Sequence, residues 1–138
     1  MTTHEQWLAL AQRCAESTGL DRNLDGDIYV LWFGDEDLRS IGYGLVRSVW
    51  MRNEHAAPEV TGSIDAIVSL IEKTLPGWWA SADLTQCPHH QFETGFRGRI
   101  QGPRYIAQDY SVSGASPALA LCRAYCIARA ELAKEDRT

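Results

Sequence analysis

The spacing of hydrophobic residues changes twice between residues 63 and 134, from a helical period to a strand period and back again. A helix buries a stripe with a period of about 3.6 residues, whereas a half-buried strand buries every second residue. The resulting order is one helix, three strands and one helix. Strands joined by short connections pair as antiparallel neighbours, and flanking helices cover one face of such a sheet. The sequence therefore predicts an α+β fold with an α-β-β-β-α module, an antiparallel sheet and both helices on one face.

The first helix of the module begins after Ser63, a preferred N-cap residue. Pro76 and Gly77 end this helix, because proline has no amide proton for the helical ladder and disfavours helical geometry in the residue before it. Between these limits the apolar residues recur with helical spacing at Ile64, Ile67, Val68, Ile71 and Leu75.

Three strands are predicted at residues 78–84, 91–100 and 104–112, with a turn at Gly102 and Pro103. The middle strand alternates between apolar and charged residues, which is typical of a half-buried strand. Its apolar set is Phe92, Thr94, Phe96 and Ile100, and its charged set is Glu93, Arg97 and Arg99. In the third strand the sequence places Ile106, Tyr110 and Val112 on one side and Tyr105, Ala107 and Asp109 on the other.

The last helix begins at Ser116 and Pro117, an N-cap serine followed by proline at the first helical position. It is predicted to run to about residue 134 and to pack across the sheet face that bears Phe92, Phe96 and Ile106. Its core stripe is predicted to be Ala118, Leu121, Cys122, Tyr125, Ala128 and Leu132.

The N-terminal half is predicted to begin with a helix over residues 4–17, in which Thr3 and Gln6 form a capping box. Within residues 23–33, the continuous apolar run of residues 28–33 favours a strand, but Leu24, Ile28, Leu31 and Trp32 also have helical spacing. Periodicity leaves both open. After this segment, residues 45–51 are predicted to be extended and residues 53–62 to form a loop.

The length of the chain, 138 residues, suits a single domain with its own core. In this domain, residues 1–60 are expected to form an N-terminal helix and variable segment, and residues 61–138 the α-β-β-β-α module.

The charge balance and the apolar stretches exclude two classes of partner. A net charge of −5 opposes general attraction to the phosphate backbone of nucleic acids. The same order of elements occurs in double-stranded RNA-binding domains, which hold phosphates with lysines at the start of the last helix, but residues 116–121 contain no lysine. No apolar stretch reaches the ~20 residues that span a bilayer, and the N-terminus lacks a secretory signal pattern. We therefore expect a cytoplasmic protein that binds neither nucleic acid nor membrane.

Four segments, in order along the chain, carry a family likeness. Residues 22–28, Arg-Asn-Leu-Asp-Gly-Asp-Ile, resemble an Arg-x-Leu-Asp-x-x-Ile stretch. Residues 62–67, Gly-Ser-Ile-Asp-Ala-Ile, resemble a Ser-Leu-Asp-Ala-Ala-Leu helix, and residues 75–78, Leu-Pro-Gly-Trp, resemble a Pro-x-Gly-Trp strand start. Residues 115–122, Ala-Ser-Pro-Ala-Leu-Ala-Leu-Cys, are similar to a closing Thr-Pro-Ala-Leu-Ala-Leu-Cys helix. Together they resemble the phage ABA sandwich domain family of small phage and prophage proteins.

This resemblance implies a phage or prophage origin, and therefore a location in the host cell cytoplasm. It also implies the α-β-β-β-α module and favours a helix for residues 23–33. It implies no catalytic residues, because the family has no assigned activity. The sequence departs from the family pattern between Phe33 and Val60.

Residues 21–27 match the opening of a calcium-binding EF-hand loop, with oxygen-bearing side chains at positions 1, 3 and 5 and glycine at position 6. Position 12 is Trp32, where calcium requires a bidentate carboxylate. The calcium coordination shell is therefore incomplete. Capping of the next helix or strand by the side chain of Asp21 or Asn23 explains these residues better than calcium binding does.

Soft metal ligands occur at Cys87, His89, His90, Cys122 and Cys126. Cysteines four residues apart share a helix face, but the sequence has no C-x-x-C pair, and free cysteines are usually small buried hydrophobes. Phosphate-cradling glycine loops and G-x-S-x-G motifs are also absent from the sequence. We expect no metal, no cofactor and no enzymatic activity.

The predicted binding site combines cationic and aromatic side chains of adjacent strands: Arg97, Arg99, Arg104, Trp78, Trp79 and Tyr105. Arginine pairs with phosphate through two parallel hydrogen bonds, and aromatic rings stack on a base. The group therefore predicts a phosphorylated, nucleotide-like small ligand. For any single residue, a solvated sheet face with buried tryptophans is the simpler interpretation.

Two hypotheses for the function follow. The first is a non-catalytic phage protein that sequesters a host nucleotide signal and so blocks an anti-phage defence. The second is an interaction protein that binds a host protein without a small ligand. Uptake of a nucleotide by the purified protein separates them. The sheet also has two edges and an uncovered face, which proteins commonly protect by association, so we expect a homo-oligomer.

Overall fold

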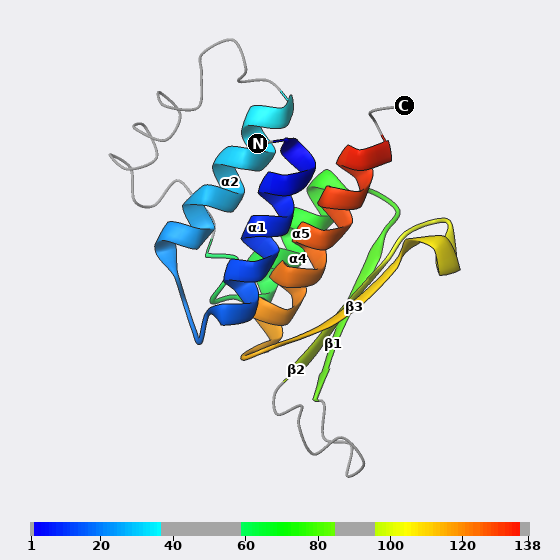
Figure 1. Cartoon of the computed structure of the whole chain (residues 1–138). Coiled ribbons are helices and arrows are strands. Elements are labelled where there is room, and N and C mark those ends of the chain that lie inside the picture. The colour runs from blue at the N-terminus through cyan, green and yellow to red at the C-terminus, as the bar shows by residue number, and fades with distance from the viewer. Residues whose placement is uncertain (1, 37–58, 85–95, 136–138) are drawn as a thin grey trace.

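The computed structural model describes residues 2–36, 59–84 and 96–135 (Figure 1). In chain order the elements are α1 (Thr3–Glu16), α2 (Arg22–Glu36), α4 (Ile64–Thr74), β1 (Trp79–Leu84), β2 (Phe96–Gln101), the 3-10 helix η1 (Tyr105–Gln108), β3 (Asp109–Gly114) and α5 (Pro117–Glu135).

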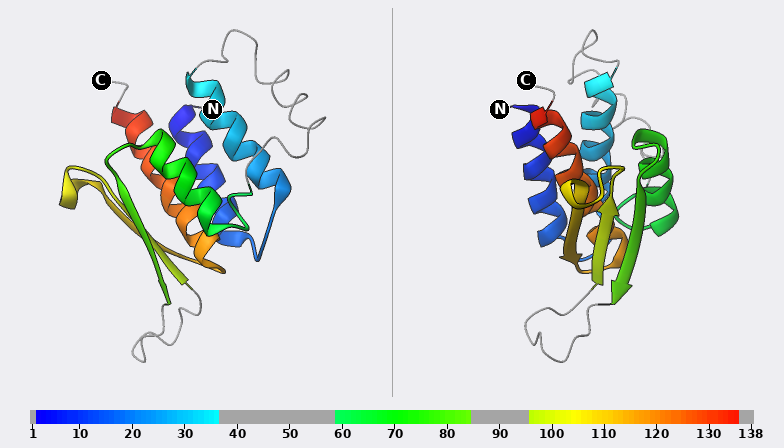
Figure 2. Two further views of the ribbon diagram at one scale, coloured as in Figure 1. Left: turned by 180° about the vertical axis from the view of Figure 1, so that it is seen from behind. Right: turned by 90° about the vertical axis from the view of Figure 1, so that its right-hand side faces the viewer.

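The strands form one antiparallel sheet in the order β1-β2-β3. The described α-helices lie on the same side of this sheet (Figure 2). α5 packs against all three strands, α4 contacts both α5 and β1, and α1 packs along α5 and also contacts α2. The predicted α+β fold, with its α-β-β-β-α order and its helices on one face, is confirmed.

The two faces of the sheet have opposite surroundings. Ile100 of β2 is fully buried and pairs with Ala80 and Tyr110, whereas its neighbour Arg99 is exposed and pairs with Ser81. We call the face that bears Ile100 the inner face and the face that bears Arg99 the outer face. The helices cover the inner face.

The predicted boundaries of α4 are confirmed. Ser63 is the N-cap of this helix, and its hydroxyl accepts a hydrogen bond from the amide of Ala66. The helix ends at Thr74, and Gly77 adopts a φ of 87°, a left-handed conformation that favours glycine. Local residue chemistry is thus sufficient to delimit this element.

α5 approaches the sheet unusually closely over two glycines. A Cβ atom added at Gly98 would lie 2.6 Å from the carbonyl oxygen of Ala120, and one added at Gly114 would lie 2.5 Å from the amide nitrogen of the same residue. Both obstacles are backbone atoms of the helix. The absence of side chains at these two inner-face positions is therefore what allows α5 to lie on β2 and β3.

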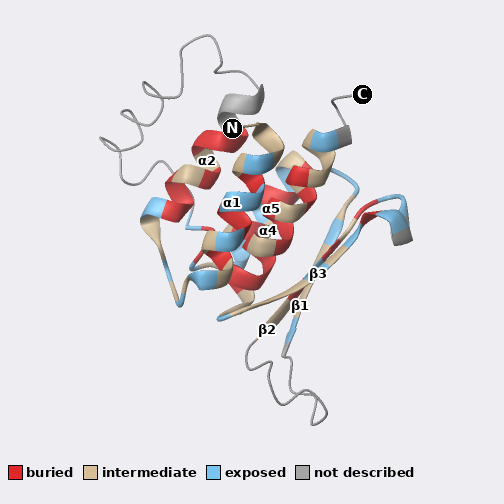
Figure 3. Ribbon diagram, in the orientation of Figure 1, coloured by how far each residue is buried: buried red, intermediate tan, exposed pale blue. Residues whose placement is uncertain are grey.

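α5 is buried on almost every side, which the single predicted stripe did not anticipate (Figure 3). The sheet covers one side of the helix, and α1 and α4 pack against others. The residues buried in addition to the stripe are mostly small: Leu119, Ala120, Ala124, Cys126 and Ala130. Leu132, predicted in the stripe, is only partly buried and packs at the margin of the core.

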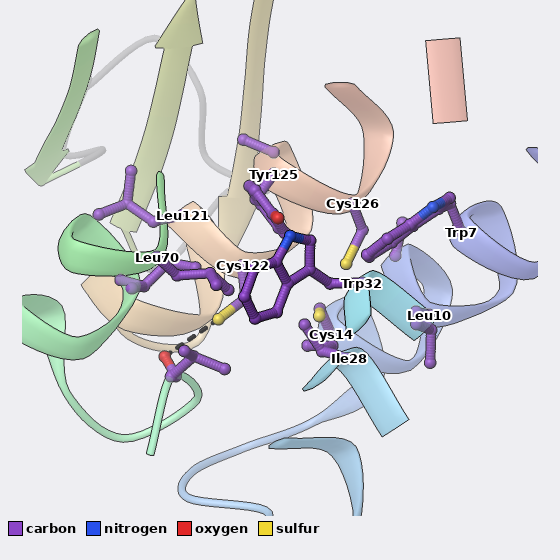
Figure 4. Packing of buried hydrophobic residues seen from close by; sticks show 14 of the residues in the cluster. Trp7, Leu10, Cys14, Ile28, Trp32, Leu70, Leu121, Cys122, Tyr125 and Cys126 are labelled. Carbon is purple, nitrogen blue, oxygen red and sulfur yellow. Dashed lines mark hydrogen bonds between the residues drawn. The ribbon is translucent and has the colours of Figure 1, made fainter. Parts of the chain in front are cut away.

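Aromatic rings join α1 to α5 at the centre of the core (Figure 4). The ring of Trp7 meets that of Tyr125 edge-on, with centroids 5.8 Å apart. The hydroxyl of Tyr125 shares a 2.9 Å hydrogen bond with the hydroxyl of Thr74 on α4. One tyrosine therefore connects three helices while its polar atom stays satisfied.

The capping box of α1 lies one residue earlier than predicted. Thr2 is the N-cap, its hydroxyl accepts a hydrogen bond from the amide of Glu5, and the Glu5 carboxylate accepts one from the amide of Thr2. The predicted pair of Thr3 and Gln6 is wrong, because both residues already lie inside the helix. A threonine pair at positions 2 and 3 makes the two registers hard to tell apart from sequence.

The segment that periodicity left open is helical. α2 covers residues 22–36, and Asp21 caps it by accepting a 3.1 Å hydrogen bond from the amide of Leu24. This is the capping role that the sequence suggested for Asp21 or Asn23. The EF-hand-like residues therefore lie in or just before a helix, not in a calcium-binding loop.

The third strand begins later than predicted. The predicted strand of residues 104–112 is replaced by η1, which contains Ile106, followed by β3. The reason is Gln108, whose side chain accepts a hydrogen bond from the amide of Arg104 and whose carbonyl accepts one from the amide of Gly102. These bonds close a turn that apolar alternation does not reveal.

The middle strand agrees with its predicted alternation over residues 96–101, while residues 91–95 lie outside the described residues. The predictions for residues 45–51 and for most of residues 53–62 also fall outside them.

Candidate functional site

The outer face is the candidate site, because it turns away from the helices (Figure 2, right). Register and alternation place three residues of each strand on it. These are Trp79, Ser81 and Asp83 of β1, Arg97, Arg99 and Gln101 of β2, and Asp109, Ser111 and Ser113 of β3.

Arg99 connects all three strands across this face. Its Nε donates a 2.8 Å hydrogen bond to Oδ1 of Asp109, and its Nη2 donates a 2.6 Å hydrogen bond to Oδ2 of the same carboxylate. On the other side, its guanidinium carbon lies 5.7 Å from the centre of the Trp79 ring. The arginine is thus held in a defined position by a carboxylate on β3 and an aromatic ring on β1.

The ion pair changes the protonation equilibria of both partners in the expected directions. The hydrogen bonds from Arg99 lower the pKa of the Asp109 carboxyl below its usual range. The hydrogen bonds to Asp109 likewise raise the pKa of Arg99. Both groups are therefore charged at neutral pH, and each reduces the net field of the other at the surface.

Arg97 lies on the same face of β2, two residues before Arg99. Its Nη1 donates hydrogen bonds to the hydroxyl of Ser111, at 3.1 Å, and to the carbonyl oxygen of Ser111, at 3.4 Å. On its other side it pairs in register with Asp83, which is exposed. The outer face therefore carries two arginines and two aspartates, together with three serine hydroxyls.

Trp79 is the large aromatic residue of this face, and 46% of its surface is exposed. Exposed indole rings are uncommon on surfaces that contact only water, and they are enriched at binding sites. The neighbouring Trp78 points elsewhere: its ring stacks on Tyr110, with centroids 6.3 Å apart and planes 9° apart. Since Tyr110 belongs to the inner face, Trp78 does not contribute to the outer face.

Of the six predicted residues, Arg97, Arg99 and Trp79 lie on the outer face, and Arg99 lies over the ring of Trp79. Arg104 is exposed and lies beyond the end of β2, in the turn before η1. Tyr105 lies in η1, and its side chain is outside the described part of the structure. The predicted site is thus reduced to a group on two adjacent strands.

Asp109 is the residue that sequence reasoning missed. The sequence placed it on the same side of the third strand as Tyr105, but it gave no reason to pair it with Arg99. That pairing depends on the β2–β3 register, in which Gln101 lies opposite Asp109 and Ser111 opposite Arg99. No local pattern in the chain reports this register.

A buried carboxylate lies on the other side of the molecule, among the helices. Oδ1 of Asp25 accepts a 2.8 Å hydrogen bond from the amide of Thr61 and a 2.7 Å hydrogen bond from its hydroxyl, while Oδ2 accepts one from Arg22 at 3.1 Å. Burial nevertheless raises the pKa of Asp25 above its usual range. These bonds fix the segment before α4 to α2, and the absence of solvent contact makes the group structural rather than a site.

The thiols of the described residues are also buried. Cys14, Cys122 and Cys126 are free cysteines of the core, and Cys122 donates a 3.0 Å hydrogen bond to the carbonyl oxygen of Val60 (Figure 4). Burial raises the pKa values of Cys122 and Cys126 well above the usual range, which keeps both thiols protonated and unreactive.

In residues 2–36, 59–84 and 96–135, no group of three or more His, Cys, Asp and Glu side chains is placed to hold a metal ion. Cys87, His89 and His90, the other predicted soft ligands, lie outside the described residues.

No protein-family model matches this sequence, and neither a curated protein nor a solved structure matches it. The resemblance to the phage ABA sandwich domain family therefore stays a prediction that rests on short segments. Among the described helices, none combines the length and the apolar character needed to cross a membrane.

Proposed function

We propose that this protein is a non-catalytic binding protein that holds a phosphorylated, nucleotide-like ligand on the outer face of its sheet. The observation that carries the proposal is the pair formed by Trp79 and Arg99, an exposed ring with a guanidinium 5.7 Å from its centre. A nucleotide presents the matching pair of groups, a flat base and an anion.

The ring supplies the contact to the base. Stacking of a base on an aromatic side chain contributes about 1–3 kcal/mol and tolerates any base, because every base has a π-face. Trp79 is exposed enough to accept such a partner without rearrangement of the core. The adjacent strand β2 then brings Arg99 within reach of the same ligand.

The arginines and serines supply contacts to the anion. Arg99 lies over Trp79, and Arg97 follows on the same face with the hydroxyl of Ser111 at 3.1 Å. Guanidinium and hydroxyl groups are frequent donors to phosphate oxygens. The buried thiols and the buried Asp25 do not face this surface and have no part in the proposed site.

The biological role we propose combines this site with the family resemblance. A small phage protein that binds a host nucleotide signal without turning it over would remove that signal and so weaken an anti-phage defence. The location in the host cytoplasm and the association into homo-oligomers belong to the same proposal.

The test is calorimetry of the purified protein against a panel of cyclic oligonucleotides and ADP-ribose derivatives. We expect at least one compound to bind without turnover. Trp79→Ala and the double change Arg97→Ala with Arg99→Ala should each weaken that binding about tenfold or more, since each removes one half of the recognition. Trp79→Phe should restore part of the affinity, because it keeps a stacking ring.

A matched control is Lys134→Ala, which removes one exposed positive charge near the end of α5. It should bind as wild type and show that the effect is local. Failure of the whole panel, or wild-type binding by the double arginine variant, would reject the nucleotide site.

A host protein is the second candidate partner, and a specific observation favours it. Asp83 and Asp109 balance the two arginines, so the outer face has mixed charge around one exposed tryptophan. Tryptophan and arginine are the residues most enriched in the energetic centres of protein interfaces. Purified protein that takes up no nucleotide, but loses a co-purifying partner on Trp79→Ala and keeps it on Lys134→Ala, would select this candidate.

A further inference from the structure

We infer that Asp109 is a built-in competitor that determines which anions the outer face accepts. Its carboxylate engages the same two donors of Arg99 that a phosphate group would use. This inference rests on the proposed nucleotide-binding function and specifies its selectivity: anions that carry an aromatic ring should bind, and inorganic phosphate should not.

The competition follows from the shape of the arginine side chain. A guanidinium group presents its donors in a planar fork that matches two oxygens of a carboxylate or of a phosphate equally well. Here Nε and Nη2 both point to Asp109, at 2.8 and 2.6 Å. A phosphate that seeks the same bidentate contact must first displace the carboxylate.

A ligand anion can replace the Asp109 carboxylate reversibly, because the ion pair of Arg99 and Asp109 lies at the surface. The side chain of Arg99 is 44% exposed and that of Asp109 is 28% exposed. Ion pairs this open to water are only weakly favourable, so a ligand can separate them. The displaced carboxylate stays beside the site, however, and repels the incoming anion. An anion without a ring therefore only takes the place of the Asp109 carboxylate on Arg99, and almost no net binding free energy results.

The tryptophan changes this balance for a ring-bearing anion. The guanidinium group of Arg99 already lies 5.7 Å from the centre of the Trp79 ring, so a phosphate on Arg99 is close to a base on Trp79. Such a ligand adds stacking to the exchange of anions, and stacking is the part that Asp109 cannot supply. The ring and the anion must therefore belong to the same molecule.

The experiment uses three probes on the full chain: adenosine 5′-monophosphate, inorganic phosphate and adenosine. We expect wild-type protein to bind the nucleotide and to show no binding of inorganic phosphate in the same concentration range. Asp109→Asn keeps the size of the side chain and removes its charge. It should bind the nucleotide about two- to fivefold more tightly, the range expected when an exposed ion pair is lost. Arg99→Gln should weaken nucleotide binding, and adenosine should bind more weakly than the nucleotide.

A second measurement follows Asp109 in the wild-type protein, so it does not depend on the folding of any variant. The carboxyl carbon of Asp109 is titrated by NMR, first alone and then with saturating nucleotide. Arg99 holds the pKa of this carboxyl below its usual range, and displacement by the ligand should raise it toward that range.

The outcomes separate the two claims. If the nucleotide binds but the Asp109 carboxyl titrates as before, or if Asp109→Asn binds it no more tightly, the competitor role is wrong and the proposed function stands. If wild-type protein binds inorganic phosphate as well as it binds the nucleotide, the selectivity is wrong. If neither wild type nor Asp109→Asn binds adenosine 5′-monophosphate, the inference is overturned, whereas the proposed function is rejected only if the panel of cyclic oligonucleotides and ADP-ribose derivatives fails as well.

Discussion

Replacing Gly98 by alanine tests the packing on which the whole sheet depends. The new Cβ atom would lie 2.6 Å from the carbonyl oxygen of Ala120 and 2.6 Å from the amide nitrogen of Leu121. Ordinary contacts of a Cβ atom begin at about 3.4 Å. The obstacles belong to the backbone of α5, so no side-chain rotation relieves them, and the helix and the sheet must move apart by several tenths of an ångström.

The expected cost follows from two opposing terms. Overpacking of a core costs about 1–3 kcal/mol, and a backbone obstacle favours the upper end of that range. The loss of glycine flexibility in the unfolded chain returns about 0.4–1 kcal/mol. The difference is a destabilisation of about 2 kcal/mol. For a domain of this size, that lowers Tm by roughly 6–10 °C.

The assay is thermal unfolding followed by circular dichroism, with two other glycine variants as controls. Gly19→Ala meets nothing within 4 Å and should melt as wild type or slightly higher. Gly77→Ala also meets nothing within 4 Å but forces alanine to a φ of 87°, which costs about 1–2 kcal/mol. Gly114→Ala should destabilise the protein about as much as Gly98→Ala. The double variant should lose less stability than the two single variants together, because one outward shift of α5 makes room for both methyl groups.

The result that refutes this reasoning is a Gly98→Ala protein that melts within about 2 °C of Gly19→Ala, given the ~3–5 °C expected per kcal/mol. Helix α5 would then not lie as close to β2 as the structure places it.

Three further predictions concern the helices and the assembly. Thr61→Val removes the hydroxyl bonded to the buried Asp25 carboxylate and should destabilise the protein by about 1–3 kcal/mol in denaturant titration, whereas Thr18→Val, at an exposed position, should change little. Burial raises the pKa of Asp25 above its usual 3.8, so the folded state binds this proton more tightly than the unfolded state does. As pH rises from 3.8 through the raised value, wild type should therefore lose stability relative to Asp25→Asn; a difference that grows in favour of wild type would contradict this. Self-association through the open sheet should give a sedimentation mass above the 15.4 kDa of one chain at micromolar concentration, and a strictly monomeric mass would exclude it.

Where helices begin and end is largely a matter of local chemistry, and here the sequence was informative. Ser63 is the N-cap of α4, as predicted, and the Ser116 hydroxyl accepts a hydrogen bond from the amide of Leu119 in the first turn of α5. Caps of this kind act over three or four residues, so their geometry is present in the chain itself. The order of the elements, and with it the α+β fold, follows from the same local signals.

The third strand shows where local signals are not sufficient. Apolar alternation predicts a strand from residue 104, but Gln108 bonds back to Arg104 and Gly102 and makes a 3-10 turn there. Gln108 is buried, so these bonds replace contacts with water that an extended chain would have kept. Whether a glutamine is buried depends on the residues that surround it in the tertiary structure, and the local sequence does not reveal these.

The sequence determined one part of the candidate site, and the tertiary structure determined the other. The chain itself supplies arginines at alternate positions of a strand, Arg97 and Arg99, and alternation alone puts both on one face. It also supplies two adjacent tryptophans, and only the register of β1 decides that Trp79 faces the site while Trp78 stacks on Tyr110. The pairing of Arg99 with Asp109 is likewise a product of the β2–β3 register. Residue types and their period are properties of the chain, whereas the partner across a strand is chosen by the packing of the whole sheet against α5.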